Sequence, residues 1–388
     1  MSFLAWIDFD QADRDRTRRI MDLFDNEDTR DELGLGSVRD ALSDIMFPGT
    51  STIQTRLRYM LFVPWIYRQA GQHSGTVAAR KEMARALEIR LIDALVRGGE
   101  QTGVIGSAAR EHLKRLPSDV YWAGLLTLGI RRFQGSRDAC LEASSGDADR
   151  LWAAGLPKAP EGFLEDTDFT TTFSLTEEEA GFLRDRLNST APESIFTQLA
   201  RSGDQGQCQM IWQHPQASSW PENFRGVVHQ AKVFSELMHG ASLMYNLMLS
   251  EQATLMQGEL NSVWQTRVSD YQTKLSDWQT STPLSLFETW DPQVLWDYAS
   301  NTIHRVAPRT KQFLETWRDL VIHSGGDTAA NASARQLIRN REMLLKGVKS
   351  RFRNDGALSR WSGASGTTPL NYRWPIVNSH LKDLANAK

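Results

Sequence analysis

The sequence has very little cysteine and no long hydrophobic run. Its 388 residues include only two cysteines, Cys140 and Cys208, which excludes a disulfide framework and a cysteine-rich zinc cage. The longest apolar stretch, Tyr59–Tyr67, is far shorter than the roughly 20 residues that cross a bilayer. The N-terminal residues MSFLAWIDFDQADRDR become charged too early for a signal peptide. We therefore expect a soluble, cytoplasmic protein with no membrane partner.

Several familiar catalytic motifs are also missing. The chain contains no GxxxxGK[ST] phosphate loop, no GxSxG nucleophile elbow, no HExxH zinc motif and no clear PD…(D/E)xK or HNH nuclease pattern. Glu236 and His239 form a single ExxH pair, whereas a di-metal carboxylate site needs two such pairs and further glutamates. A polar notch in a packed helix is the simpler interpretation of this pair. We expect neither a metal nor another cofactor.

Neither sign of charge is in large excess. The 44 basic and 47 acidic side chains give a formal net charge of −3, so the protein is no polycation. If it binds nucleic acid, it does so through a local basic face. A content of 40% hydrophobic and 23% charged residues is typical of a globular protein and excludes disorder along the whole chain.

Helical periodicity dominates the chain. The clearest helical patterns cover Ser37–Met46, Val77–Val96, Thr176–Leu187, Asn223–Leu260 and Asn261–Thr280. Thr176 and Glu179 are predicted to form a capping box at the start of the third of them. Strand-like alternation is rare, and Cys208–Trp212 is one of its few examples. The sequence therefore predicts a mainly α fold of two helical lobes with few short strands. We assign five of the tryptophans to core and interhelix packing: Trp264, Trp278, Trp290, Trp296 and Trp317.

A change in composition predicts the domain boundaries. Residues 136–175 are rich in Gly, Ala, Ser, Asp and Pro and have weak periodicity, which indicates a linker or an irregular crossover. The predicted N-terminal helical domain, with the candidate site, covers residues 1–135. The predicted C-terminal helical domain, with a basic stripe, covers residues 176–388.

Charged residues are densest between Arg30 and Tyr67. On the predicted helix after Gly36, Asp40 and Asp44 lie four residues apart and share one face, and Arg39 and Arg56 can offset their repulsion. The turn FPGTS at 47–51 follows this helix.

A second helix is predicted to begin at Ser51 or Thr52 and to end or kink at Pro64. One of its faces carries Thr55, Arg56 and Tyr59, with Gln54 and Arg58 at the boundary. Two short helices joined by a tight turn thus present carboxylates, arginines, an amide and a tyrosine, a mixture that suits a polar, anionic substrate. The alternative is an interhelical salt-bridge network that only fixes the turn.

Asp8 is a second candidate acid. It lies inside the apolar run LAWIDF, where a charge costs stability unless it is paired or useful. Pairing with a nearby arginine is the alternative explanation.

A basic stripe lies near the C-terminus. Residues 334–353 contain seven basic side chains and one acidic one, a local charge of +6. Arg335, Arg339, Lys346, Lys349 and Arg353 follow steps of three and four residues and line one helix face, provided that the helix continues through Gly347. Such a stripe with aromatic residues nearby is typical of phosphate contact with base stacking. The alternative is a solvated charged face.

Four segments resemble a bacterial family that occurs in phage-defence loci and was long catalogued as a domain of unknown function. They are AWIDF near the start, RDELGLGSVRDALSDIMFPGTSTIQTRLRYMLFVPWIY from Arg30, HGASLMYNLMLSE from His239, and NYRW from Asn371. The resemblance extends from residue 4 to about residue 385. One member of that family is an antiviral DNA glycosylase that removes α-glucosylated hydroxymethylcytosine from the DNA of T-even phages and leaves abasic sites.

The resemblance implies that double-stranded phage DNA carrying glucosylated bases is the partner. In such a reaction the base is flipped out of the duplex, and a carboxylate stabilises the positive charge on the sugar or activates a water. The charge pattern gives three candidate carboxylates, Asp8, Asp40 and Asp44. The candidate substrate and DNA contacts are Arg39, Gln54, Thr55, Arg56, Arg58, Tyr59, Lys346, Lys349 and Arg353. A non-catalytic DNA-binding sensor or adaptor of a defence system is the alternative function.

Overall fold

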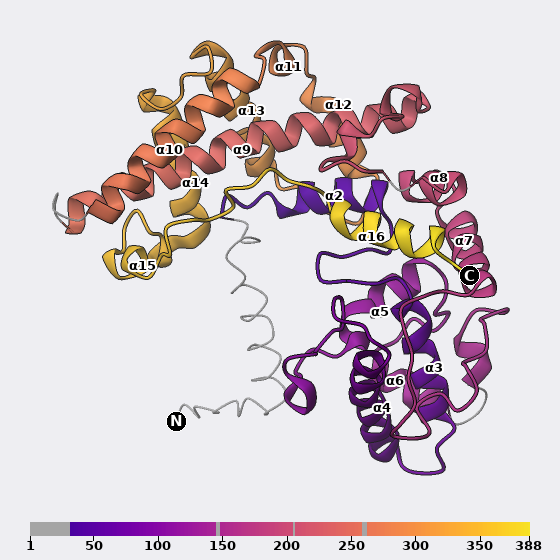
Figure 1. Ribbon diagram of the computed structural model, residues 1–388. Helices are drawn as coiled ribbons and strands as arrows, with labels where there is room; N and C mark the ends of the chain where they lie inside the picture. Colours follow the sequence, from indigo (N-terminus) through magenta and orange to yellow (C-terminus); the bar gives the residue numbers. More distant parts are fainter. Residues whose placement is uncertain (1–31, 145–147, 205, 258–261) are drawn as a thin grey trace, which may run out of the picture. The chain divides into compact units, whose positions relative to one another are not determined.

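A computed structural model describes residues 32–144, 148–204, 206–257 and 262–388. Figure 1 shows helices and connecting segments throughout these residues, and their strand-like pairing is limited to one isolated bridge between Arg131 and Trp152. The prediction of a mainly α fold is confirmed. The prediction of strand-like structure at Cys208–Trp212 is wrong, because the last two of these residues belong to a short 3-10 helix, η4 (Ile211–Gln213). Among the described residues, no helix has the length and apolarity to cross a membrane.

Contacts divide the chain into two compact units. Unit 1 consists of Met1–Ala41 and His229–Leu370, and unit 2 consists of Leu42–Val228 and Asn371–Lys388. These boundaries differ from the predicted ones, since residues 136–175 lie entirely within unit 2. Although this segment is irregular, it contributes buried aromatic rings: Trp152, Phe163 and Phe173. Composition therefore indicated the loss of regular structure in the segment but not its packing.

Unit 2 is built around one almost fully buried helix, α3 (Tyr59–Gly71). Helices α4, α5 and α6 pack against it (Figure 1). The helices of unit 2 are α3, α4 (Val77–Arg97), η2 (Arg110–His112), α5 (Pro117–Thr127), α6 (Arg137–Ala143), η3 (Ala148–Leu151), α7 (Glu177–Thr190), α8 (Ile195–Ser202), η4, η5 (Ala217–Ser219) and α16 (Trp374–Ala385). The predicted capping box of α7 is confirmed, since Thr176 accepts from the backbone of Glu179 and the Glu179 carboxylate accepts from the backbone of Thr176.

Helix α9 (Glu222–Gln257) begins in unit 2 and supplies the central helix of unit 1. Two predicted core tryptophans donate their indole N–H to its backbone: Trp278 to the Glu236 carbonyl and Trp317 to the Leu237 carbonyl, each at 2.9 Å. All five predicted tryptophans are buried, so that prediction is confirmed. The other helices of unit 1 are α10 (Ser262–Ser281), α11 (Ser285–Glu288), α12 (Pro292–Ser300), α13 (Pro308–His323), α14 (Ala332–Lys346), η6 (Gly347–Lys349) and α15 (Asp355–Ser359). Helix α2 (Gly36–Met46) begins in unit 1 and ends in unit 2.

Helix α5 approaches the turn at 47–50 closely enough to require a glycine. A Cβ atom placed on Gly124 would lie 2.3 Å from the carbonyl oxygen of Gly49. We expect Gly124→Ala to lower the free energy of unfolding by about 1–3 kcal/mol, because the backbone of the turn must move. Gly181 of α7 is the matched control, since a Cβ there meets nothing within 4 Å. Gly181→Ala should instead stabilise the protein by about 0.5–1 kcal/mol.

Chemical denaturation of both variants tests this expectation. Equal stabilities of the two alanine variants would contradict the close approach.

Candidate functional site

Residues 51–58 do not form the predicted helix. Helix α3 begins only at Tyr59 and contains Pro64 in its interior, so Pro64 does not end it. Tertiary hydrogen bonds replace helical ones, because the backbone N–H groups of Thr55 and Arg56 both donate to the Tyr121 hydroxyl, at 2.9 and 3.1 Å. That hydroxyl donates in turn to the Arg56 carbonyl at 2.7 Å. The predicted helix face carrying Thr55, Arg56 and Tyr59 is therefore not formed.

Arg56 makes a bidentate ion pair with Asp383 of α16. Its Nε and Nη2 lie 2.9 and 2.7 Å from Asp383 Oδ1. The backbone N–H of Leu57 donates to Asp383 Oδ2 at 2.8 Å, and the Arg56 guanidinium lies 4.6 Å from the centre of the Phe173 ring. Burial raises the pKa of Asp383, and the hydrogen bonds from Arg56 and Leu57 oppose that rise. Arg56 thus fixes the irregular segment to the C-terminal helix.

Arg58 is buried in a second ion pair. Its Nη2 and Nε donate to the two carboxylate oxygens of Glu179, at 2.7 and 3.0 Å, and its Nη1 donates to the Thr172 carbonyl at 2.7 Å. Both side chains are less than one tenth exposed. A guanidinium occupied in this way is not available to contact substrate or DNA. For Arg56 and Arg58 the structure favours the alternative of a salt-bridge network.

Gln54, Thr55 and Tyr59 also lie inside unit 2. The Tyr59 hydroxyl accepts from the backbone N–H of Ile105 at 3.0 Å, and the Thr55 hydroxyl donates to the Gly103 carbonyl at 2.7 Å. Neither the Tyr59 ring nor the Gln54 amide is open to solvent. Tyr59 is therefore a core residue rather than a contact for substrate or DNA.

Asp44 is a candidate acid that remains accessible to a substrate. Its side chain is 37% exposed, and Arg373 donates to its Oδ1 at 2.6 Å. The same guanidinium nitrogen donates to the Thr50 carbonyl at 2.8 Å. Arg373 thereby joins the acid at the end of α2 to the turn that follows it.

The backbone that presents Arg373 is strained. Tyr372 and Arg373 have φ values of 53° and 68°, in the left-handed region that costs roughly 1–2 kcal/mol for each residue that is not glycine. The buried Tyr372 ring packs edge-on against Trp212. Trp374, the next residue, donates its indole N–H to the Cys208 carbonyl at 3.0 Å. These contacts hold the segment NYRW in a conformation that places Arg373 on Asp44.

The other two candidate acids lie elsewhere. Asp40 belongs to unit 1, where its carboxylate accepts from Arg39 Nε at 3.0 Å, and both side chains are about one third exposed. Asp8 lies outside the described residues. Within the described residues, Asp44 alone among the three candidates belongs to unit 2.

Several buried polar atoms of residues 51–58 and of α16 have no hydrogen-bond partner among the described residues. They are Ser51 Oγ, Gln54 Oε1, Asn378 Oδ1 and both ring nitrogens of His380. Along α16, Asn378 and His380 fall between the two residues that bind the segment, Arg373 and Asp383. Burial lowers the pKa of His380 to about 3, and the charge of Arg56 acts in the same direction. His380 is therefore a neutral imidazole at physiological pH.

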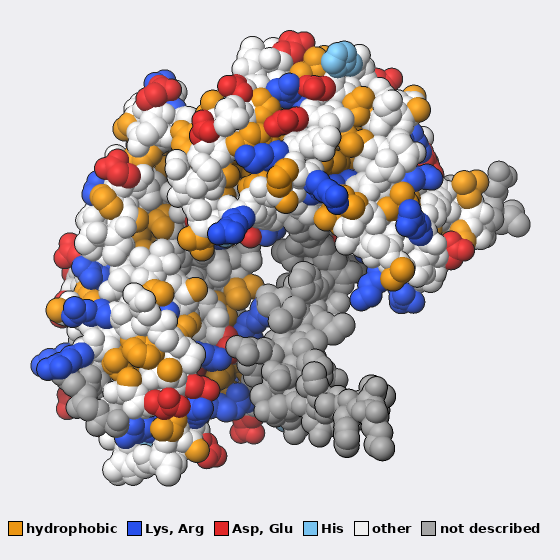
Figure 2. Space-filling view, turned by 180° about the vertical axis from the view of Figure 1, so that it is seen from behind, with side chains coloured by type: hydrophobic (Ala, Val, Ile, Leu, Met, Phe, Trp, Pro, Cys, Tyr) orange, Lys and Arg blue, Asp and Glu red, His pale blue; other side chains and the backbone are white. Residues whose placement is uncertain are grey.

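The predicted basic stripe is interrupted. Helix α14 ends at Lys346 and Gly347 has a φ of 53°, so the five basic residues do not line one helix face. In unit 1, Lys346 pairs with Glu32 and Arg335 pairs with Glu251. Lys349 and Arg353 are exposed. Figure 2 shows basic side chains scattered among acidic and hydrophobic ones on the visible face.

A family model matches the whole chain, residues 1–388, and describes a family of unknown function, DUF6361. The chain belongs to DUF6361. Comparisons with curated proteins and with solved structures gave no match.

Sequence reasoning missed a second buried polar cluster of this DUF6361 protein. Glu88 of α4 is fully buried and accepts from the backbone N–H and the hydroxyl of Ser118, both at 2.8 Å. Arg137 and Tyr67 also donate to the Ser118 hydroxyl, at 2.9 and 3.3 Å. Burial raises the pKa of Glu88 to about 7, against the hydrogen bonds from Ser118. The sequence contains a signal for this cluster, because Glu88 follows Leu87 and precedes Leu91 on the apolar face of α4.

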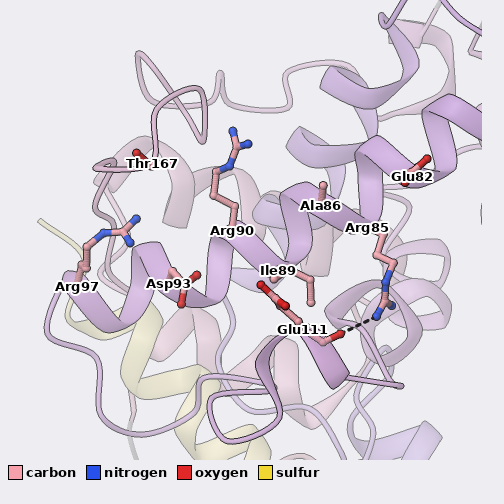
Figure 3. A pocket seen from close by; sticks show the side chains of 9 residues that line it. All are labelled: Glu82, Arg85, Ala86, Ile89, Arg90, Asp93, Arg97, Glu111 and Thr167. Atoms are coloured by element: carbon pink, nitrogen blue, oxygen red, sulfur yellow. Dashed lines mark hydrogen bonds between the residues drawn. The ribbon is translucent and has the colours of Figure 1, made fainter.

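A cavity of about 440 Å³ lies on the outer side of α4 (Figure 3). At this cavity Arg85 donates to the Glu111 and Leu113 carbonyls, and Arg90 donates to the Leu164 carbonyl. The predicted site residues do not line this cavity. Its lining is Glu82, Arg85, Ala86, Ile89, Arg90, Asp93, Arg97, Glu111 and Thr167.

The two carboxylates bound to arginines should respond differently to neutralisation. Asp383→Asn leaves the Arg56 charge without its buried partner, so we expect the free energy of unfolding to fall by about 3 kcal/mol. Asp44→Asn removes a more exposed carboxylate, 37% against 5% for Asp383, and leaves Arg373 its hydrogen bond to the Thr50 carbonyl, so we expect a smaller loss of about 1 kcal/mol. Urea denaturation of both variants measures the difference. A larger loss for Asp44→Asn would contradict the assignment of Arg56–Asp383 as the structural pair.

The buried Glu88 predicts a pH dependence of stability. Its pKa is about 7 in the folded protein against a reference of 4.5, so the folded state binds one more proton between these values. The free energy of unfolding should therefore fall, by about 3 kcal/mol in total, as the pH rises from about 4.5 to 7. Glu88→Gln keeps an acceptor for Ser118 but cannot titrate. Denaturation at pH 5 and pH 7 should show a smaller fall for this variant than for the wild type, and an unchanged fall would contradict the role of Glu88.

Proposed function

We propose that the protein is an antiphage DNA glycosylase that excises α-glucosylated hydroxymethylcytosine from viral DNA and leaves an abasic site. The observation that supports this proposal is the ion pair between Arg373 and Asp44. It joins two of the segments on which the family resemblance rests, the one that begins at Arg30 and the NYRW segment. Residues more than 300 positions apart in the sequence thus form one polar site in unit 2.

The chemistry of base excision requires an accessible carboxylate. As the bond between the base and C1′ of the sugar breaks, positive charge develops on the sugar ring, and the bond electrons leave with the base. A carboxylate beside C1′ stabilises that charge or takes the proton of the attacking water. Asp44 meets this requirement, because it is half-exposed and Arg373 holds one of its oxygens in place.

The arrangement around Asp44 is fixed before a substrate arrives. Arg373 bridges Asp44 and the Thr50 carbonyl, and the strained backbone at Tyr372 and Arg373 is retained by buried aromatic packing. Strain of this kind is more common at functional sites than elsewhere. A preorganised charge is worth more in catalysis than one that must reorient during the reaction.

The glucosyl group explains how such an enzyme spares host DNA. A site that hydrogen-bonds the sugar hydroxyls leaves its own polar groups unpaired when plain cytosine enters, and that loss discriminates strongly. The bulk of the modified base also requires that it leave the base stack before it reaches the site.

Base release from modified DNA tests the proposal. The purified protein is incubated with glucosylated phage DNA or with unmodified DNA, and mild alkali then cleaves any abasic site. We expect strand breaks in the modified DNA alone, and we expect Asp44→Asn to lower the rate of base release about 100-fold or more.

Asp93→Asn is the matched control. Asp93 is also a half-exposed aspartate of unit 2 that pairs with an arginine, Arg110. Its variant should keep the wild-type rate. Tight, salt-dependent binding without breaks would instead indicate a non-catalytic DNA sensor, and breaks without alkali would indicate a nuclease or a lyase. Either result would overturn the glycosylase proposal.

A further inference from the structure

The turn after α14 in unit 1 exposes apolar side chains. Val348, at the centre of η6, is 85% exposed, and Leu344 and Leu345 in the last turn of α14 are 53% and 44% exposed. Gly347, with its left-handed φ of 53°, ends the helix and begins the turn. Three exposed apolar side chains within five residues form a small hydrophobic tip. We call Leu344, Leu345 and Val348 the apolar tip.

The turn that carries the apolar tip is rigid. Glu342 is fully buried, accepts from the Ser350 hydroxyl, and accepts from the backbone N–H of Arg351 at 2.8 Å. The Val348 carbonyl accepts from Asn354 Nδ2 at 3.1 Å. Ser350 N–H donates to the Gly347 carbonyl at 3.2 Å. These bonds fix the backbone on both sides of Val348, so its exposure is a property of the folded turn.

Positive charge surrounds the apolar tip. Lys349 follows Val348 directly, and Lys349, Arg353 and Arg339 are all exposed. Lys349 makes no ion pair with a described residue, and the Arg339 guanidinium lies 5.3 Å from the centre of the Phe352 ring. The acid of residues 334–353 is Glu342, which is buried. The exposed charged side chains of residues 334–353 are therefore basic, which is complementary to a polyanion.

We propose that the apolar tip is a wedge that enters the minor groove of duplex DNA, with Val348 inserted at a base step and Lys349 and Arg353 on the flanking phosphates. This inference rests on the proposed function for the identity of the substrate. Proteins that bend or open DNA commonly insert an apolar side chain between base steps while neighbouring basic residues hold the backbone. A wedge at a base step also lowers the cost of moving a base out of the stack.

The size of the tip favours DNA over a lipid surface. A helix that binds a membrane surface buries one long apolar face, often with Trp, Phe and Leu. The apolar tip is one helical turn followed by a tight loop, and it ends in a single β-branched side chain. Such a compact protrusion matches the narrow minor groove.

The experiment uses a duplex that contains 2-aminopurine, whose fluorescence rises when the base unstacks. We expect the full-length wild-type protein to raise this fluorescence, and we expect Val348→Ser to lose most of the rise and to bind about 5- to 10-fold more weakly. Ile303→Ser is the matched control, because Ile303 is a 90% exposed apolar residue of the same unit outside the basic segment. This variant should behave as the wild type. Equal fluorescence and affinity for the wild type and Val348→Ser would overturn the proposal.

The salt dependence tests the two basic residues. Replacing Lys349 and Arg353 together by alanine should reduce the slope of log K against log salt by about 2, roughly 0.9 for each lost phosphate contact. An unchanged slope would overturn their assignment. Binding of the wild type to anionic vesicles that depends on Val348, without binding to DNA, would show a lipid partner and would also overturn the proposal.

The wedge and the glycosylase can fail separately. Asp44→Asn should still unstack 2-aminopurine, because the wedge does not use that carboxylate. Val348-dependent unstacking by a wild-type protein that releases no base would contradict the glycosylase and support the wedge. Base release by Val348→Ser at the wild-type rate, with unchanged unstacking, would contradict the wedge and support the glycosylase.

Discussion

Two ion pairs with buried carboxylates hold the irregular segment 51–58 on which the rest of unit 2 depends. Arg56 pairs with Asp383 and Arg58 pairs with Glu179, and each pair joins positions more than 100 residues apart. Burying a charge is expensive unless its partner and further hydrogen bonds are in place. Here the Leu57 N–H donates a further hydrogen bond to the Asp383 carboxylate, and Arg58 donates a further one to the Thr172 carbonyl. The chain can therefore leave helical geometry and still satisfy its polar groups.

The arginine–carboxylate pairs of unit 2 differ in how far their carboxylates are exposed. The Arg56–Asp383 and Arg58–Glu179 pairs fix the backbone, and in both of them the carboxylate side chain is 5% exposed. In the pair of Asp44 and Arg373 the carboxylate is 37% exposed, and Arg373 is presented by a strained backbone beside the packed side chains of Tyr372 and Trp374. Burial thus separates the structural pairs from the pair that we propose to be reactive, although their side chains have the same chemistry in the sequence.

Unit 1 follows a simpler principle. Helix α9 is its central helix, and the indole N–H groups of Trp278 and Trp317 donate hydrogen bonds to the carbonyls of two adjacent residues of that helix. Gly240 allows this approach, because a Cβ there would lie 2.4 Å from the Trp278 ring. Large aromatic side chains give such a unit much of its buried area, and each indole N–H finds an acceptor. In the same unit the buried Glu342 accepts hydrogen bonds from Ser350 and Arg351 and so holds the surface turn that exposes Val348.

The sequence by itself determined the helical class, the bounds of α2, α4, α7 and α10 to within a few residues, the capping box at Thr176 and the burial of five tryptophans. These features depend on local periodicity and local hydrogen bonds, which are readable along the chain. Only the tertiary structure decided that residues 51–58 are not helical, because the Tyr121 hydroxyl that replaces their helical hydrogen bonds lies more than 60 residues away. It also decided that Arg56 and Arg58 are structural while Asp44 is accessible, since a charge pattern records the type of a side chain but neither its burial nor the distant partner that pairs with it.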